Sequence, residues 1–184
     1  FNKITKVVVE EGVTYIGKNA FNGCRNLTSV TLPLSLTTIG TQAFSGCTSL
    51  TSIEFKGNLQ YIKEHAFDAS GLTNLVVPEG VLEIGYGAFY GCSSLTSLDL
   101  SSFNTSSVTD MNHMFQGCIN LTTLDLNLFN TSNVIDMSYM FSYCSSLTSL
   151  DLSSFNTSKV TDMNLMFDHC SSLTSLNLSS FDTS

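Results

Sequence analysis

The sequence is poor in charged residues, proline and tryptophan. Charged side chains make up 12% of the 184 residues, proline occurs twice, and tryptophan is absent. Lysine and arginine together number seven and the net charge is −8, so the chain lacks the basic surface that nucleic-acid phosphates require. No run of about 18 apolar residues is present, which excludes membrane insertion of this segment. The chain starts within a repeat pattern and without a signal-like leader, so we expect a fragment of a longer protein.

Charge and glycine are distributed unevenly along the chain. Residues 1–96 carry six basic and seven acidic side chains, whereas residues 97–184 carry one lysine and eight aspartates. Eleven of the 12 glycines precede residue 97. Apolar residues make up 42% of the chain, enough to form a packed core. Such a break in composition often separates two domains, but the repeat pattern predicts one.

The cysteines mark this repeat, at positions 24, 47, 92, 118, 144 and 170. Each begins the frame Cys-x-x-Leu-x-x-Leu-x-Leu or a close variant of it. The gap of 45 residues between the second and third cysteines divides into 23 and 22, with Ala69 in the cysteine position of the intermediate unit. We therefore predict a single solenoid over residues 1–184, with units of 22–23 residues over 6–96 and of 26 residues over 97–184.

Two periodicities within each unit predict its path. The alternating Leu-x-Leu segment predicts a short strand with one buried face, and successive strands would pair in parallel. The eight expected strands are 7–9, 30–32, 53–55, 75–77, 98–100, 124–126, 150–152 and 176–178. Apolar residues at offsets of three and four, such as Met111, Met114 and Phe115, predict a helical turn on the return path.

The predicted fold class is thus an α/β repeat solenoid of the leucine-rich type. Short parallel β-strands would form its concave face and short helical turns its convex face. A parallel β-helix is the competing architecture, because it would replace the helical turns with further strands.

These units resemble a known family. Segments of the form Ile-x-x-x-Ala-Phe-x-x-Cys-x-x-Leu, such as 39–50, resemble the BspA-like (Treponema-type) leucine-rich repeats. Segments reading Leu-Asp-Leu-Ser-Ser-Phe-Asn-Thr-Ser, at 98–106 and 150–158, resemble the longer repeats of BspA-family surface proteins. The resemblance implies a cell-surface or secreted protein that binds host matrix proteins or other cells. It brings no catalytic residue with it.

An aspartate column is the most informative polar feature. Asp99, Asp125 and Asp151 lie between the two inward leucines of their strands, so they should point outward from the concave face, and Asn177 continues the column. The equivalent upstream positions form a more apolar strip. Stacked carboxylates repel one another unless a basic partner lies nearby, which makes the column a candidate partner surface, although a merely solvated face is an equal alternative. The candidate binding residues are Asp99, Asp125, Asp151, Asn177, Glu54 and Val76.

Other polar patterns are interpreted as structural. A second column of Asp110, Asp136 and Asp162 precedes the inward methionines and is expected to cap the start of each predicted helical turn. The Asn-Thr-Ser segments at 104–106, 130–132 and 156–158 suit turns, and they also match the glycosylation sequon, a choice that depends on the source organism.

No enzyme site, metal site or cofactor site is predicted. The cysteines occupy equivalent positions and form a line, which favours buried free thiols over disulfides or a tetrahedral metal site. The methionines fall at the inward positions of the long units, where they fill the core. His65, His113 and His169 are expected to lie apart on the surface, at three different repeat positions, so no triad is expected.

The leading functional hypothesis is a non-catalytic solenoid that binds a protein partner, such as a host matrix or cell-surface protein, through its concave face. A structural spacer that displays another domain is the alternative, and a calcium-binding surface is a weaker one. We also expect that the truncated array can associate end to end, because its terminal units have no polar cap.

Overall fold

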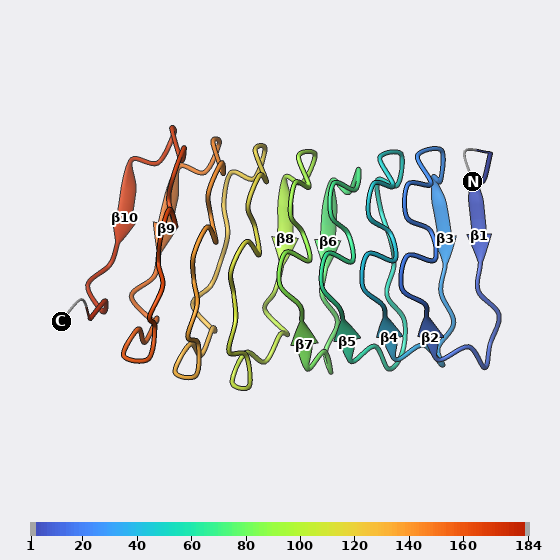
Figure 1. Cartoon of the computed structure of the whole chain (residues 1–184), viewed down its shortest axis with the longest axis horizontal. Coiled ribbons are helices and arrows are strands. Elements are labelled where there is room, and N and C mark those ends of the chain that lie inside the picture. Colours follow the sequence, from blue (N-terminus) through green and yellow to red (C-terminus); the bar gives the residue numbers. More distant parts are fainter. Residues whose placement is uncertain (1–2, 183–184) are drawn as a thin grey trace.

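The computed structural model describes residues 3–182 as a single right-to-left stack of coils, one coil for each repeat (Figure 1). Ten strands of two or three residues are present, and no helix occurs among the described residues. None of those residues therefore belongs to a helix that could cross a membrane. The leucine-rich solenoid is confirmed, and the α/β class is corrected to an all-β solenoid.

The first strand column corresponds to the predicted sheet, but it is interrupted. Its strands form three parallel pairs: β1 (Lys6–Val8) with β3 (Ser29–Thr31), β6 (Asn74–Val76) with β8 (Ser97–Asp99), and β9 (Ser149–Asp151) with β10 (Ser175–Asn177). Each strand starts one residue before the expected position. Residues 53–55 and 124–126 are not paired as strands, although Ile53 and Leu124 are buried as predicted.

A second strand column runs along the outer side of the short units. It consists of β2 (Tyr15–Ile16), β4 (Thr38–Ile39), β5 (Tyr61–Ile62) and β7 (Glu83–Ile84), which pair in parallel in that order. The isoleucines point inward and align with one another, so the column closes the core on a second side. This column was not predicted, and it gives the short units the character of the competing β-helix.

The long units replace this column with isolated bridges, which join Asp110 to Asp136 and Asp136 to Asp162.

The predicted helical turns are wrong, because two residues in each return turn have left-handed backbone. In the first described turn these are Asn19 (φ 58°) and Gly23 (φ 70°), and the same pair of positions recurs in seven turns. A continuous α-helix requires negative φ at every residue, so it cannot pass through these positions. The inward offsets of three and four are nevertheless correct: Met111, Met114 and Phe115 are all fully buried.

The backbone of each turn bonds alternately to itself and to the next coil. Asn19 N donates to Thr41 O at 2.9 Å and Phe21 N to Ala43 O at 2.9 Å, both in the following unit. The intervening N–H of Ala20 bonds locally to Gly17 O at 3.1 Å. The turn therefore joins neighbouring coils by a ladder of hydrogen bonds, as a strand would, without being extended.

A continuous core fills the solenoid from Ile16 to Met166. Stacked phenylalanines run along it, with Phe44 and Phe67 at 5.6 Å between ring centroids and Phe115 and Phe141 at 5.7 Å. A second row of phenylalanines is also buried, since Phe103, Phe129 and Phe155 are 1–3% exposed.

Candidate functional site

The candidate binding residues all lie on the face formed by the first strand column, which we call the strand face. Parallel pairing places Val76 beside Asp99 and Asp151 beside Asn177. All six predicted residues are exposed, with Val76 at 64%. Their outward orientation is the one that the sequence predicts.

Each aspartate of this column also holds the turn that follows its strand. The N–H groups of Ser101, Asn127 and Ser153 donate to the Oδ1 atoms of Asp99, Asp125 and Asp151, two residues earlier, at 2.9–3.0 Å. Asn177 accepts the same bond from Ser179 N at 3.1 Å. These are Asx turns, in which a side-chain oxygen stands in for a backbone acceptor. The turn itself therefore needs an Asp or an Asn, and it does not need the negative charge.

The hydrogen bonds affect the ionisation of the column. They lower the pKa of Asp99, through the hydroxyl and then the N–H of Ser101. The pKa of Asp151 is lowered in the same way by the N–H and hydroxyl of Ser153. Both carboxylates are thus ionised at neutral pH, and the strand face of the C-terminal region is a row of negative charges.

Two hollows open on the strand face. One, of about 340 Å³, lies between residues 52–55 and 74–78 and is lined by Glu54 and Val76. The other, of about 80 Å³, lies between Asp99 and Asp125, beside Leu128, which is 71% exposed. Each hollow borders a coil whose first-column segment is unpaired (53–55 and 124–126). Four of the six predicted residues therefore border a hollow, Glu54 with Val76 and Asp99 with Asp125, whereas Asp151 and Asn177 line neither.

The second aspartate column supports corners of the coil, as predicted, although no helix begins there. The N–H groups of Asn112, Ser138 and Asn164 donate to the Oδ1 atoms of Asp110, Asp136 and Asp162 at 2.8–2.9 Å. Burial raises the pKa of Asp110, with a further rise from the nearby charge of Asp136. Burial acts in the same direction on Asp136, but hydrogen bonds from Ser138 and Asn112 outweigh it and lower its pKa.

The asparagines of the Asn-Thr-Ser segments form a third column of Asx turns. The N–H groups of Ser106, Ser132 and Ser158 donate to the Oδ1 atoms of Asn104, Asn130 and Asn156 at 3.0–3.1 Å. These hydrogen bonds show that the Asn-Thr-Ser segments form turns, as the sequence predicts.

The threonines of these segments are buried and link neighbouring coils. Thr105 Oγ1 accepts a bond from Asn130 N at 2.7 Å and donates to Asn130 O at 3.1 Å. Thr131 does the same with Asn156. Sequence reasoning missed this role, although a threonine at a fixed position in three successive units was a signal for it.

The six cysteines are free thiols arranged in a line, and five of them are buried. Cys144 Sγ donates to Phe115 O, in the preceding coil, at 3.2 Å. Burial raises the pKa of Cys144 to about 12, so this thiol is protonated and unreactive at neutral pH. In the unit that lacks a cysteine, Ser70 and not Ala69 takes the cysteine position, so the predicted alignment is wrong by one residue. Ser70 is buried, and its Oγ lies 3.4 Å from Cys92 Sγ.

The histidines are less scattered than predicted. His65 and His113 occupy one repeat position, the first left-handed residue of the turn, instead of two different ones. Tyrosine rings separate them on the outer face: Tyr86 lies 4.6 Å from His65 and 6.3 Å from His113, between ring centroids. His169 stacks on Tyr143 at 4.3 Å. The shared position could have been found by counting back from the buried phenylalanine two residues later.

These rings form no catalytic constellation. His65 Nδ1 lies 3.6 Å from Asp68 Oδ2, and His169 Nδ1 lies 2.8 Å from Asp168 Oδ1, but within residues 3–182 neither pair contacts a serine, threonine or cysteine side chain that could act as a nucleophile. The thiol of Cys170, next to His169 in sequence, donates instead to Phe141 O at 3.1 Å. Among residues 3–182, no group of three or more His, Cys, Asp or Glu side chains converges as a metal site would require.

Comparison with known proteins gives two family matches. Residues 1–111 match the BspA type leucine-rich repeat region in six copies. Residues 86–184 match a family described as a Mycoplasma protein of unknown function, DUF285. The two matches overlap between residues 86 and 111. No curated protein matches the chain significantly.

Solved structures of repeat proteins are also similar. A leucine-rich repeat protein of T. pallidum is 31% identical, and the match covers 79% of this chain and 78% of that one, with a TM-score of 0.56. A leucine rich cell surface protein from Faecalibacterium prausnitzii A2-165 is 22% identical over 96% of this chain and 60% of its own, with a TM-score of 0.48. A leucine-rich repeat protein from Bacteroides capillosus ATCC 29799 is 30% identical over 53% of this chain and 77% of its own, with a TM-score of 0.46.

Proposed function

The chain belongs to the BspA type leucine-rich repeat family over residues 1–111 and to the DUF285 family over residues 86–184, and on this basis we propose that it is a non-catalytic, protein-binding part of a microbial cell-surface or secreted protein. The strand face is the proposed contact surface, and adhesion to host matrix or to other cells is the proposed outcome. Leucine-rich repeats in general mediate protein–protein interaction, and a solenoid offers its strand side as an extended surface.

The observation that carries this proposal is the aspartate column. Asn177 shows that an uncharged residue forms the same Asx turn, so the turn does not explain why Asp99, Asp125 and Asp151 carry charge. Within residues 3–182 no lysine or arginine pairs with these exposed carboxylates, and such a row is suited to a basic patch on a partner. The apolar side chain of Val76, beside Asp99, extends this surface toward the short units.

The triple variant Asp99→Asn, Asp125→Asn, Asp151→Asn tests the proposal, because it removes three charges and keeps every Asx acceptor. The purified chain and the variant would be tested on a panel of immobilised extracellular-matrix and cell-surface proteins. Saturable binding by the native chain that weakens in the triple variant supports adhesion through the strand face.

The double variant Glu10→Gln, Glu79→Gln is a control, since it removes two exposed charges from outside the strand face. Equal losses in the control and in the triple variant would show a general effect of net charge. No binding to the panel, or binding that the triple variant leaves intact, would contradict the proposal and favour the spacer alternative. The calcium alternative has no converging carboxylate cluster within the described residues to support it.

A further inference from the structure

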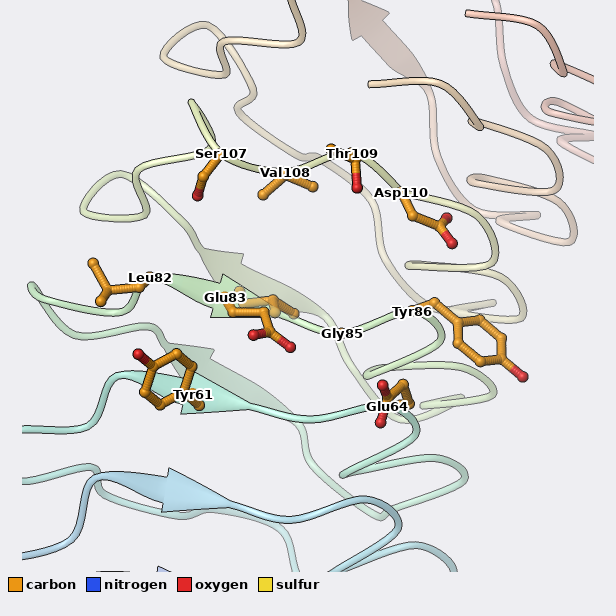
Figure 2. Close-up of a pocket in the computed structure, with 11 residues that line it drawn as sticks. Tyr61, Glu64, Leu82, Glu83, Gly85, Tyr86, Ser107, Val108, Thr109 and Asp110 are labelled. Carbon is orange, nitrogen blue, oxygen red and sulfur yellow. The ribbon is translucent and has the colours of Figure 1, made fainter. Parts of the chain in front are cut away.

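A groove of about 500 Å³ lies on the outer side of the molecule, where the last short unit meets the first long unit (Figure 2). We call it the seam groove. One wall is β7 with the residues around it, 82–86, and the opposite wall is the segment 107–110 of the next coil. Tyr61 and Glu64 of the preceding unit complete the lining. The seam groove is separate from the strand face and shares no residue with the hollows there.

The seam groove exists because rungs of the inter-coil hydrogen-bond ladder are missing at this boundary. In the second strand column, the carbonyls of Ile16, Ile39 and Ile62 accept hydrogen bonds from the N–H groups of Gly40, Lys63 and Gly85 at 2.8–2.9 Å. Ile84 occupies the next position in this series, and no N–H of the described chain donates to its carbonyl. Within residues 3–182, no backbone hydrogen bond joins 82–86 to 107–110.

The ladder resumes on either side of the gap. Beyond it, Ile135 N donates to Thr109 O at 2.8 Å, so the long units pair with one another at the same position. Further around the coil, Gly91 N donates to Gln116 O at 2.7 Å, so a backbone bond joins the two coils again there. Residues 82–86 and 107–110 are therefore fixed edges that face each other without pairing. Their unpaired backbone groups are a template for an added strand.

The lining of the seam groove is rich in hydrogen-bond acceptors and negative charge. Glu64, Glu83 and Asp110 contribute three carboxylates, and Lys63, which binds Glu83 at 2.8 Å, is the one cation in contact with them in the described chain. The hydroxyls of Ser107 and Thr109 point from their wall toward β7 (Figure 2). Burial holds the pKa of Asp110 above its ordinary value, which a cation placed beside it would reverse.

From this geometry we infer that the seam groove is a docking slot for an extended segment of a partner protein that carries lysine or arginine. The backbone of the segment would pair with the open edge of β7, and its basic side chains would meet Glu64, Glu83 and Asp110. Strand addition to an open sheet edge supplies backbone hydrogen bonds, while the charges select a basic sequence. This site is independent of the proposed strand-face function, so either can fail without the other.

The test uses a fluorescently labelled hexapeptide of alternating lysine and valine, with blocked ends, titrated with the full chain and followed by fluorescence anisotropy. Two comparison peptides separate the contributions: one replaces lysine by glutamate, and the other carries N-methyl groups on alternate backbone nitrogens. We expect saturable binding of the basic peptide, with at least about tenfold weaker binding of both comparison peptides.

Two variants locate the binding. Glu64→Gln, Glu83→Gln, Asp110→Asn removes the charge and keeps an acceptor oxygen at each position, and Ser107→Trp fills the groove with a ring. Ser102→Trp, on the same coil but outside the groove, is the matched control, since both serines are exposed. We expect at least about a tenfold loss of affinity in the first two and none in the control.

Equal binding of the N-methylated peptide, or binding that survives in both groove variants, would overturn the docking slot. So would concentration-dependent dimerisation that Ser107→Trp abolishes while the basic peptide fails to bind, since the occupant would then be a second copy of the chain. The triple aspartate variant of the strand face should bind the basic peptide as the native chain does.

Discussion

The short units of residues 6–96 and the long units of residues 97–182 stack in one solenoid, but the backbone on the outer side is held in different ways in the two regions. The short units use a second strand column, in which backbone groups of neighbouring coils pair directly. The long units keep only isolated backbone bridges here and add side-chain contacts: three Asx turns in each coil and a buried threonine that bridges to the next coil. At the boundary between the short and the long units, no backbone hydrogen bond joins residues 82–86 to residues 107–110, and the seam groove opens there.

Both regions contain part of the line of free cysteines. Among our predictions, we expect the largest effect from alkaline pH, which should lower the stability of the protein by ionising these thiols. Burial raises the pKa of Cys47 to about 12, of Cys92 to about 11 and of Cys144 to about 12. Unfolded thiols ionise near pH 9, so unfolding releases protons above that pH, and the free energy of unfolding falls as the pH rises from about 9 to 12. The slope approaches about 1.4 kcal/mol per pH unit for each thiol.

Thermal unfolding followed by circular dichroism between about pH 8 and 10.5 measures this loss. Cys47→Ser and Cys144→Ser should each reduce it, one in each region, and Ser70 shows that the position accepts serine. If both variants lose stability as steeply as the native chain, the thiols are not the titrating groups.

The threonine bridge belongs to the long units alone, and Thr131→Val should break it. Thr131 is 1% exposed, and its hydroxyl both accepts from Asn156 N and donates to Asn156 O. Valine has the same shape and leaves both backbone groups without a partner, at an expected cost of about 2–3 kcal/mol. Chemical denaturation measures it. The control is Thr148→Val, an exposed threonine with one long bond of 3.5 Å, which should cost less than about 0.5 kcal/mol.

The regions also differ at the left-handed turn positions, where the long units often carry residues with large side chains. Leu165 has φ 54° and is 51% exposed, whereas Asn19 takes the same position in the first described turn. Leu165→Asn should raise the free energy of unfolding by about 0.5–1 kcal/mol, because asparagine tolerates this conformation better than leucine. The exposed Leu128, whose φ is not positive, gives a control: Leu128→Asn should leave stability unchanged, and an equal gain there would refute the backbone explanation.

Much of the fold could be predicted from the sequence because each structural position recurs with a similar residue in several repeats. The inward residues of the first strand column and of the return turns were identified correctly, including Leu98, Met111 and Phe115. Offsets of three and four, however, bring the same residues inward in a helix and in a turn that has two left-handed residues four positions apart. Side-chain patterning alone could not separate these two, so the helical turns were predicted wrongly.

Other features depend on how coils of unequal length meet, which no single unit records. The unit without a cysteine is one residue short, and the missing residue lies between Ser70 and Leu72; only burial and hydrogen bonding show that Ser70, not Ala69, takes the cysteine position. The gap between β7 and residues 107–110 likewise lies between two different kinds of unit. On this side, short units bond to short units and long units bond to long units. Outward placement of the aspartate column was predictable from strand alternation, but its Asx bonds to residues two positions later were not anticipated.

The central functional claim is that charge on the strand face serves a partner rather than the fold. The most direct measurement is the association rate with a protein identified in the binding panel, followed as a function of salt concentration for three chains: native, the triple Asn variant at Asp99, Asp125 and Asp151, and Asn177→Asp. The account predicts a rate that falls with salt in the native chain, falls less in the triple variant and falls more in Asn177→Asp, with the melting temperature unchanged throughout. The same salt dependence in all three chains would contradict the account, and the formation of Asx turns would then be the one role left for the aspartate column.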